Sequence, residues 1–337
     1  MRVFPFDWAT PISRALRRTG WSRWTNFKRR GCSQPSLREI FHSPFRKIAP
    51  SLSSSPPLFI FSSALSAHSL STSNSPAAMA STVVPDQFQR VLVMRHGHRS
   101  DMGPGVDRSW WTTVPRPWDA PLSDEGRNKA LETGKNFRAK LEFPIHRVVT
   151  SPFLRCVETA RALIAGLSTA DDGDSADSSS SRIKVSIEYG MCEILNDISL
   201  WHHPTDHDSW GFDIKELEAS FPPGVADPAP HRVYKEMPQW GESESGARDR
   251  YLHTIHSVVD RYPQENLLFV THGEGVKVMA STYWKDARGH ELRPDYFGYA
   301  HLKRQLVRNG NLFNASKFRI TTKPDETGIE LKPLQQA

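Results

Sequence analysis

From about residue 86 onward, apolar residues occur in two patterns, as short runs typical of strands and at the spacing typical of helices. Two runs of consecutive apolar residues, 91–94 and 267–270, predict short buried strands. Residues 146–150 and 183–187 predict two more strands. Between and after the strands, apolar residues recur at helical spacing. They predict helices that begin after Ser123, Ser151, Ser243 and Gly275. Strands that alternate with helices predict an α/β domain with a mainly parallel sheet.

The remaining segments lack such periods. Residues 101–122 form a long connection, and its tryptophans, among them Trp110, Trp111 and Trp118, argue against disorder there. Residues 188–241 are rich in Pro, Trp and His, which predicts an insertion over the sheet. Residues 312–321 predict one late edge strand. We therefore expect one folded domain at 86–325 and a C-terminal tail at 326–337.

The first 85 residues differ in composition from the rest. They carry eleven Lys and Arg against two acidic residues, Asp7 and Glu39, a net charge of +9. This Ser-, Pro- and Arg-rich leader cannot bury enough apolar surface to fold, so we expect residues 1–85 to be disordered. The composition resembles an organellar transit peptide, which implies a plastid or mitochondrion. The alternative is that translation starts at Met79, which implies the cytoplasm.

Charge, hydropathy and cysteine spacing exclude several classes of partner. Because the whole chain is +6, residues 86–337 carry −3, so the basic character belongs to the leader and gives no argument for nucleic-acid binding. The apolar patch at 57–61 is far shorter than the about 20 residues that span a bilayer, so we expect no membrane partner. Cys32, Cys156 and Cys192 lack metal-site or disulfide-framework spacing and are expected to be ordinary thiols.

Candidate chemistry gathers where strands end. Two predicted strands each end in His-Gly, at His96 and His272, and the carboxyl ends of parallel strands meet at one edge of a sheet. Arg95 and Arg99 flank the first histidine, and Arg155 lies in the first turn of the helix after Ser151. Guanidinium groups match phosphate oxygens, and a helix N-terminus favours anions. The arrangement predicts a phosphate site in which a histidine attacks phosphorus.

The sequence resembles the histidine phosphatase superfamily, with its phosphoglycerate-mutase-like fold. Four ordered motifs carry this resemblance, which covers about residues 88–320. They are Met94-Arg95-His96-Gly97, the segment 117–126, the segment 151–160 and Val270-Thr271-His272-Gly273. It is most similar to the phosphatase domains of the suppressor-of-T-cell-signalling proteins, through Arg99 and the Pro117-Trp118-Asp119 segment. The resemblance implies a three-layer α/β/α sandwich and suggests a homodimer as one assembly.

The resemblance also implies roles for individual residues. The function implied is a phosphatase that hydrolyses a phosphomonoester, on a small molecule or a phosphoprotein, through a phosphohistidine on His96. Arg95, Arg99 and Arg155 would bind the phosphate, and His272 would complete its cradle. A general acid is also required, and Glu193 fits the family position better than its neighbour Glu188, whose other role is a structural hydrogen bond. This route needs no metal and no cofactor.

Three other functions compete with this interpretation. His96 and His98, or the histidine-rich segment 201–208, would suit a metal hydrolase, although the arginines would repel a metal cation. A phosphoglycerate-mutase-type transfer would need further basic motifs that we do not find. A non-catalytic phosphate- or protein-binding module is the third. His98 is either an exposed loop residue or a substrate contact, and Glu274 either points outward or binds a cationic part of the substrate.

Overall fold

The computed structural model describes residues 87–103, 105–107, 109–168, 183–200, 210–309, 312–323 and 326–334. These residues belong to one unit of the chain, 84–337. The predicted leader and the histidine-rich segment 201–208 lie outside the described residues.

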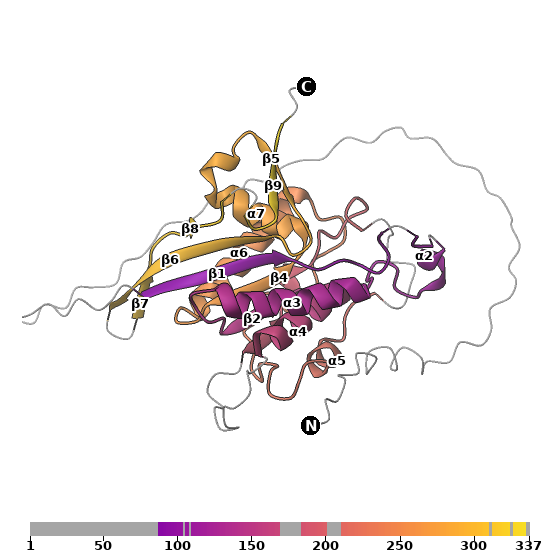
Figure 1. Cartoon of the computed structure of the whole chain (residues 1–337), viewed down its shortest axis with the longest axis horizontal. Coiled ribbons are helices and arrows are strands. Elements are labelled where there is room, and N and C mark those ends of the chain that lie inside the picture. The colour runs from indigo at the N-terminus through magenta and orange to yellow at the C-terminus, as the bar shows by residue number, and fades with distance from the viewer. Residues whose placement is uncertain are drawn as a thin grey trace, which may run out of the picture. The chain divides into compact units, whose positions relative to one another are not determined.

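A central sheet organises this unit (Figure 1). Its strands follow the order β3-β2-β4-β1-β6-β7, and β8 pairs with β6. Strands β1 to β4 run parallel to one another, whereas β6 lies antiparallel to β1. The mainly parallel sheet confirms the predicted α/β fold. The strand bounds are β1 Gln87–Arg95, β2 Arg147–Thr150, β3 Lys184–Ile187, β4 Leu267–Thr271, β6 Tyr299–Asn309, β7 Leu312–Ala315 and β8 Arg319–Ile320.

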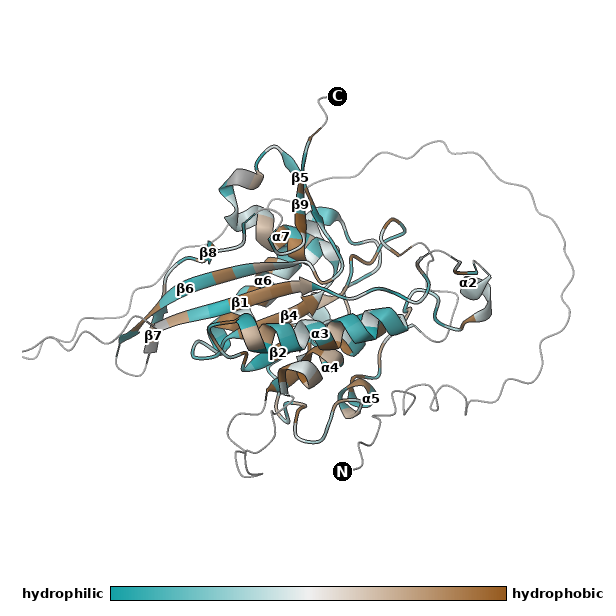
Figure 2. Cartoon of the chain, in the orientation of Figure 1, coloured by the Kyte–Doolittle hydropathy of each residue, from teal (hydrophilic) through white to brown (hydrophobic). Residues whose placement is uncertain are grey.

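Helices cover both faces of the sheet, as a three-layer sandwich requires. Alternate residues of β1 point to opposite faces, because side chains alternate along a strand. Leu92 and Met94 join the core under α3 (Asp124–Lys140) and α4 (Leu154–Ser168). Val91 and Val93 join the core under α6 (Glu244–Arg261) and α7 (Gly273–Tyr283). The strands of the sheet centre are strongly hydrophobic and α3 is mostly hydrophilic, as expected for buried strands and a surface helix (Figure 2).

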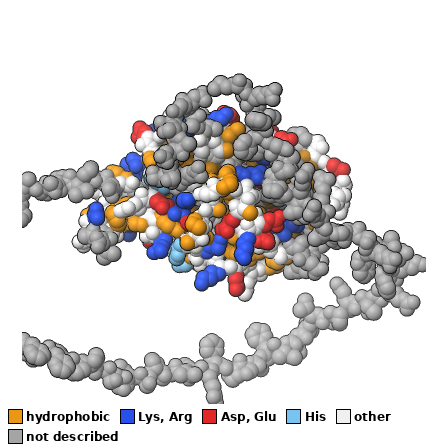
Figure 3. Space-filling model, turned by 90° about the horizontal axis from the view of Figure 1, so that it is seen from below, with side chains coloured by type: hydrophobic (Ala, Val, Ile, Leu, Met, Phe, Trp, Pro, Cys, Tyr) orange, Lys and Arg blue, Asp and Glu red, His pale blue; other side chains and the backbone are white. Residues whose placement is uncertain are grey.

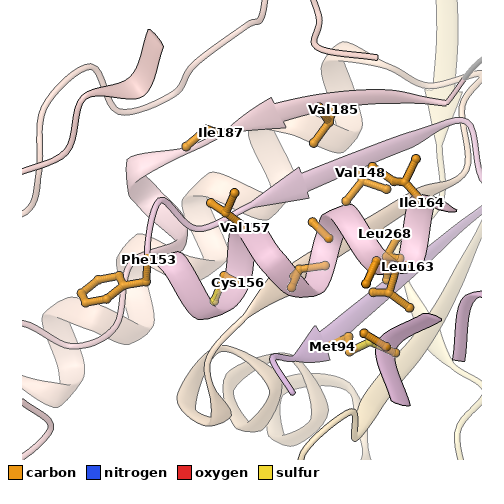
Figure 4. Close-up of a cluster of buried hydrophobic side chains, with 14 of the residues drawn as sticks. Met94, Val148, Phe153, Cys156, Val157, Leu163, Ile164, Val185, Ile187 and Leu268 are labelled. Atoms are coloured by element: carbon orange, nitrogen blue, oxygen red, sulfur yellow. The ribbon is translucent and has the colours of Figure 1, made fainter. Parts of the chain in front are cut away.

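The helix α4 begins just after β2, at the edge of the sheet where the parallel strands end. Its inner face carries Cys156, Val157, Leu163 and Ile164 against residues of the neighbouring strands such as Val148 (Figure 4). Asp119 fixes the N-terminus of this helix, because its Oδ1 accepts a hydrogen bond from the backbone N of Leu154 at 2.7 Å. Two serines cap the helices α3 and α6. Oγ of Ser123 accepts from Gly126 N at 3.0 Å, and Oγ of Ser243 accepts from Gly246 N at 3.1 Å.

The segment after α7 differs from the prediction. Strand β6 was not predicted, and the single edge strand expected at 312–321 is divided into β7 and β8. The segment 326–337, expected to be a tail, contains β9 (Ile329–Pro333), which pairs antiparallel with β5 (His290–Pro294). Ile329 is fully buried, so β9 belongs to the folded core. The remaining elements are α2 (Trp110–Thr113), η1 (Tyr189–Met191), α5 (Ile214–Ala219) and η3 (Lys285–Ala287).

The visible surface mixes both signs of charge. On the face in Figure 3, Lys and Arg side chains are interspersed with Asp and Glu. This mixture agrees with the small net charge of residues 86–337. In the described part of the chain, no helix combines the length and the apolar character needed to cross a membrane.

Candidate active site

His96 lies immediately after β1, with a fixed ring orientation. Its backbone N donates to the carbonyl of Thr271 at 2.9 Å, which ties the ends of β1 and β4 together. Its Nδ1 lies 2.8 Å from the carbonyl oxygen of Gly97. A carbonyl oxygen only accepts, so Nδ1 carries the proton and Nε2 keeps its lone pair. Burial and the nearby positive charges of Arg155 and Arg95 hold the pKa of His96 well below 6.5. His96 is therefore a neutral imidazole with one free nitrogen.

His272 follows β4 and lies beside His96. The two ring centroids are 5.4 Å apart, with one ring edge facing the other. The Nδ1 of His272 lies 3.2 Å from Oε2 of Glu193 and 3.2 Å from Nη2 of Arg155, and its Nε2 lies 3.0 Å from Oγ of Ser151. Burial lowers the pKa of His272 to about 4, although Glu193 acts in the opposite direction. The structure thus brings the two predicted histidines into one site.

Two of the three predicted arginines present unused donors there. Arg155 is fully buried, and its Nη1 donates to the carbonyl of Trp118 at 3.3 Å. The Nη1 of Arg95 donates to the carbonyl of Pro294 at 2.8 Å. Among the described residues, no partner accepts from the buried Nε of either arginine. Buried donors without partners are costly, so this pair of N–H groups indicates a site for an anion.

Arg99 differs from the other two arginines. Its Nε and Nη2 both bind the carboxylate of Asp101, at 2.8 and 2.5 Å. Its positive charge still reaches the site, because Arg99, after burial, is the main influence that lowers the pKa of Arg155. Arg99 therefore contributes positive charge near the site, but its Nε and Nη2 donors are already used by Asp101.

The two candidate acids occupy different environments. Glu188 is buried, and its carboxylate accepts three backbone hydrogen bonds, from Gly190 at 2.9 Å, Val233 at 2.7 Å and Tyr234 at 2.9 Å. That is the structural role considered for it in the sequence. Glu193 instead contacts the site, 3.2 Å from His272 and 3.9 Å from Nη2 of Arg155.

Glu193 is ionised in this arrangement. Burial alone would raise its pKa, but the charge and hydrogen bond of His272 and the charge of Arg155 outweigh burial and lower it to about 2. An ionised carboxylate is ready to accept a proton. It must gain one before it can protonate a leaving group.

Tyr296 is a site residue that the sequence analysis missed. Its ring centroid lies 4.3 Å from the guanidinium carbon of Arg95, 5.6 Å from the ring centroid of His96 and 4.6 Å from that of His98. The next residue, Phe297, has φ 65, a conformation that is unusual for a bulky residue. The cluster of aromatic residues around Gly298 was the available signal, but it lies 24 positions beyond His272 and matches none of the motifs.

His98 and Glu274 lie near the site without joining its centre. The ring of His98 is half-buried against Tyr296 and Phe297, so it is not an exposed loop side chain. Glu274 is in the first turn of α7 and forms an ion pair with Lys277 at 3.2 Å. Within the described residues, no group of three His, Cys, Asp or Glu side chains is arranged to hold a metal ion.

The tryptophan of the long connection that lies nearest the site is part of the core. Trp118 is 3% exposed, and its ring contacts those of Phe153, Trp210 and Phe212 edge to face. It pins the connection rather than lining an open pocket. Cys156 and Cys192 are free and buried, as expected of ordinary thiols.

The comparisons with known proteins concern the same region. The family model of the histidine phosphatase superfamily (branch 1) matches residues 91–173. The match supports membership of the histidine phosphatase superfamily. The matched segment runs from β1 through α4, and so includes Arg95, His96, Arg99 and Arg155, whereas Glu193 and His272 lie beyond it. No curated protein matches the chain.

Solved structures of phosphatases and mutases resemble the chain at low identity. One is the ecdysone phosphate phosphatase of Bombix mori in complex with tungstate, 21% identical, covering 68% of this chain and 92% of that one, with a TM-score of 0.45. A mycobacterial glucosyl-3-phosphoglycerate phosphatase is 18% identical, with coverages of 70% and 98% and a TM-score of 0.39. A phosphoglycerate mutase from Bacillus anthracis is 14% identical, with coverages of 69% and 93% and a TM-score of 0.40.

Proposed function

We propose that this protein is a metal-independent phosphatase that hydrolyses phosphomonoesters through a phosphohistidine on His96. One observation carries the proposal. A neutral buried histidine, whose Nε2 carries a lone pair, lies beside two arginines whose buried Nε–H groups have no partner among the described residues. A phosphate group would satisfy those donors, and the neutral ring would supply the electron pair that attacks phosphorus.

The reaction follows two displacements. Nε2 of His96 forms a bond to phosphorus while the bond from phosphorus to the ester oxygen breaks. Arg95 and Arg155 hold the phosphoryl oxygens as charge shifts toward the leaving oxygen. Water then attacks the phosphohistidine, the phosphorus–nitrogen bond breaks, and inorganic phosphate leaves. Splitting the reaction in this way replaces one difficult displacement with two easier ones.

Glu193 supplies and removes protons in this scheme. The negative charge of a bound phosphate raises the pKa of an adjacent carboxyl group, so Glu193 can hold the proton that the leaving oxygen needs. Once it has given up that proton, Glu193 is again a carboxylate and takes a proton from the attacking water.

Activity toward an aryl phosphate tests the proposal directly. The parent chain should hydrolyse the ester in the presence of EDTA, and His96→Ala should not. Equal activity in both proteins would refute the nucleophile, and loss of parental activity in EDTA would refute metal independence. Glu193→Gln should reduce hydrolysis of an alkyl phosphate more than that of an activated aryl phosphate, because only a poor leaving group needs the acid.

The branch, partners and location are further parts of the proposal. We infer the suppressor-of-T-cell-signalling branch from Arg99 and Pro117-Trp118-Asp119, and a phosphorylated small molecule or phosphoprotein as substrate. A homodimer is proposed from the same resemblance, and light scattering tests it. Import into a plastid or mitochondrion is proposed for translation from Met1, and a cytoplasmic location for translation from Met79. Fusions that begin at either methionine distinguish these two outcomes.

A further inference from the structure

The two nitrogens of His272 face opposite kinds of partner. On the Nε2 side are two neutral groups, the hydroxyl of Ser151 at 3.0 Å and the thiol of Cys156 at 3.6 Å. On the Nδ1 side are two charged groups, the Glu193 carboxylate and the Arg155 guanidinium, each at 3.2 Å. Ser151, Arg155 and His272 are all fully buried, so water does not compete for these contacts.

Glu193 and Arg155 favour opposite protonation states of Nδ1. Arg155 only donates, so it requires a lone pair on Nδ1, whereas the carboxylate of Glu193 only accepts and requires a proton there. With a pKa of about 4, His272 is neutral at pH 7 and carries one proton. The groups at Nε2 must therefore decide which nitrogen holds it.

Ser151 favours the proton on Nδ1. Its Oγ already accepts from the backbone N of Phe153, at 3.5 Å, so its hydroxyl hydrogen has Nε2 as an acceptor. If Nε2 carried the proton, the hydrogen of this fully buried hydroxyl would be left with the sulfur of Cys156, a weaker acceptor than an imidazole nitrogen. Burial also raises the pKa of Cys156, so its thiol stays protonated; its one hydrogen has both the carbonyl of Thr271 and Nε2 of His272 at 3.6 Å, so Cys156 is at most a weak influence on the tautomer.

We propose that Ser151 is a positioning residue that fixes His272 as its Nδ1–H tautomer, so that a donor points toward Glu193 and the phosphate site. This deepens the proposed function, because His272 must donate to complete a phosphate cradle. The order Ser151–His272–Glu193 is that of a hydrolytic triad, but here the serine is fully buried and donates to the ring, so it cannot reach a substrate. Arg155 favours the other tautomer, because it donates toward Nδ1.

Nitrogen NMR of the unliganded full chain tests the tautomer without any turnover. In protein labelled with ¹⁵N-histidine, the shifts of His272 should show a proton on Nδ1 and a lone pair on Nε2. The signals are assigned by their loss in His272→Gln. In Ser151→Ala the population should move toward Nε2–H, because the hydroxyl that donates to Nε2 is gone and Arg155 still donates toward Nδ1. A parent with its proton on Nε2, or an unchanged tautomer in Ser151→Ala, would overturn the proposal.

Kinetics supply a second readout and a matched control. Ser151→Ala should lower kcat/KM for an aryl phosphate about tenfold, as expected for the loss of one net hydrogen bond, and Ser151→Thr should restore part of it. Ser186→Ala is the control, because Ser186 is also a buried serine on a parallel strand, β3, and contacts Arg147 instead of the site. Equal losses in both alanine variants would indicate a packing effect and refute positioning. An inactive parent chain would contradict the proposed phosphatase and leave the NMR result standing.

Discussion

Two strands of the sheet end in the same His-Gly motif, at His96-Gly97 after β1 and at His272-Gly273 after β4. We call these the first and the second corner. They differ in the contacts that orient the histidine ring. His96 fixes its ring through the carbonyl of its own neighbour, Gly97. The ring of His272 instead contacts side chains from other parts of the chain, among them Ser151, Arg155 and Glu193. The first corner is therefore determined locally, and the second depends on three other segments. A nucleophilic histidine needs a lone pair that always lies on the same nitrogen. In a histidine that donates to phosphate, neighbouring side chains can set which nitrogen carries the proton.

The glycines of the two corners differ as well. A Cβ on Gly97 would lie 2.5 Å from the ring of Phe297, a contact that real side chains do not make. A Cβ on Gly273 would lie 3.6 Å from Nε of Arg95, an ordinary contact. Gly97 is therefore required by the close approach of Phe297, whereas Gly273 is not required by space.

The largest expected difference between the corners concerns the covalent step. His96→Ala should lower kcat by at least about 10⁴-fold and abolish the phosphoenzyme, because it removes the atom that bonds to phosphorus. His272→Ala should cost about 10²–10³-fold and still form the phosphoenzyme, since it removes one donor to the phosphate. Rapid quenching with a radiolabelled ester measures both. A phosphoenzyme that is lost only in His272→Ala would reverse the assignment.

The low pKa of His272, in the second corner, should make the free energy of unfolding depend on pH. The unfolded chain protonates histidine near pH 6.5, but folded His272 resists protonation until about pH 4. Between these values the unfolded state binds more protons, so the free energy of unfolding should fall as pH falls. His272 alone accounts for roughly 3 kcal/mol of this loss. Urea unfolding from pH 7 to 4 should therefore give a flatter profile for His272→Gln. Parallel profiles for parent and variant would contradict the low pKa.

Alanine at the two glycines gives a smaller difference. Gly97→Ala should destabilise the fold by about 1–3 kcal/mol, because Phe297 must move from a tightly packed position. Gly273→Ala should be neutral or slightly stabilising, since Gly273 begins α7 and alanine favours helix. Denaturant midpoints at constant slope measure both variants. Equal destabilisation would show that the corners are sterically alike.

The smallest expected effect belongs to Tyr296, whose ring contacts Arg95 and His96 of the first corner. Its cation–π contact with Arg95 contributes roughly 0.5–1 kcal/mol, so Tyr296→Ala should raise KM a few-fold and leave kcat nearly unchanged. Steady-state kinetics would detect this change. A large fall in kcat with constant KM would instead mean that Tyr296 acts on the reacting groups.

The sequence reveals the first corner better than the second, for a physical reason. The apolar run before Arg95 and the glycine after His96 are local signals of a strand followed by a turn. The contacts of His272 depend on packing between β2, α4 and the segment after η1, which no periodicity reports. The choice between Glu193 and Glu188 likewise required the three backbone donors that hold Glu188.

Strand β6 was missed because its inward positions are not all apolar. Its residues alternate correctly between buried and less buried positions, but Arg304 occupies one of the buried ones. The guanidinium is accommodated because it binds Asp260, the side chain of Gln89 and the carbonyl of Val259. A charged residue at a core position hides the strand from any analysis based on hydrophobic alternation.

The pairing of β5 with β9 has a consequence for synthesis on the ribosome. Arg95 leaves the exit tunnel early, but the carbonyl that holds its guanidinium belongs to Pro294, in the strand that β9 covers. The neighbouring backbone is also tied to the same late segment, through Asp295 N to the carbonyl of Gly328. We therefore expect a nascent chain to lack a formed anion site until residues 328–333 emerge, long after Arg95 itself has left the exit tunnel.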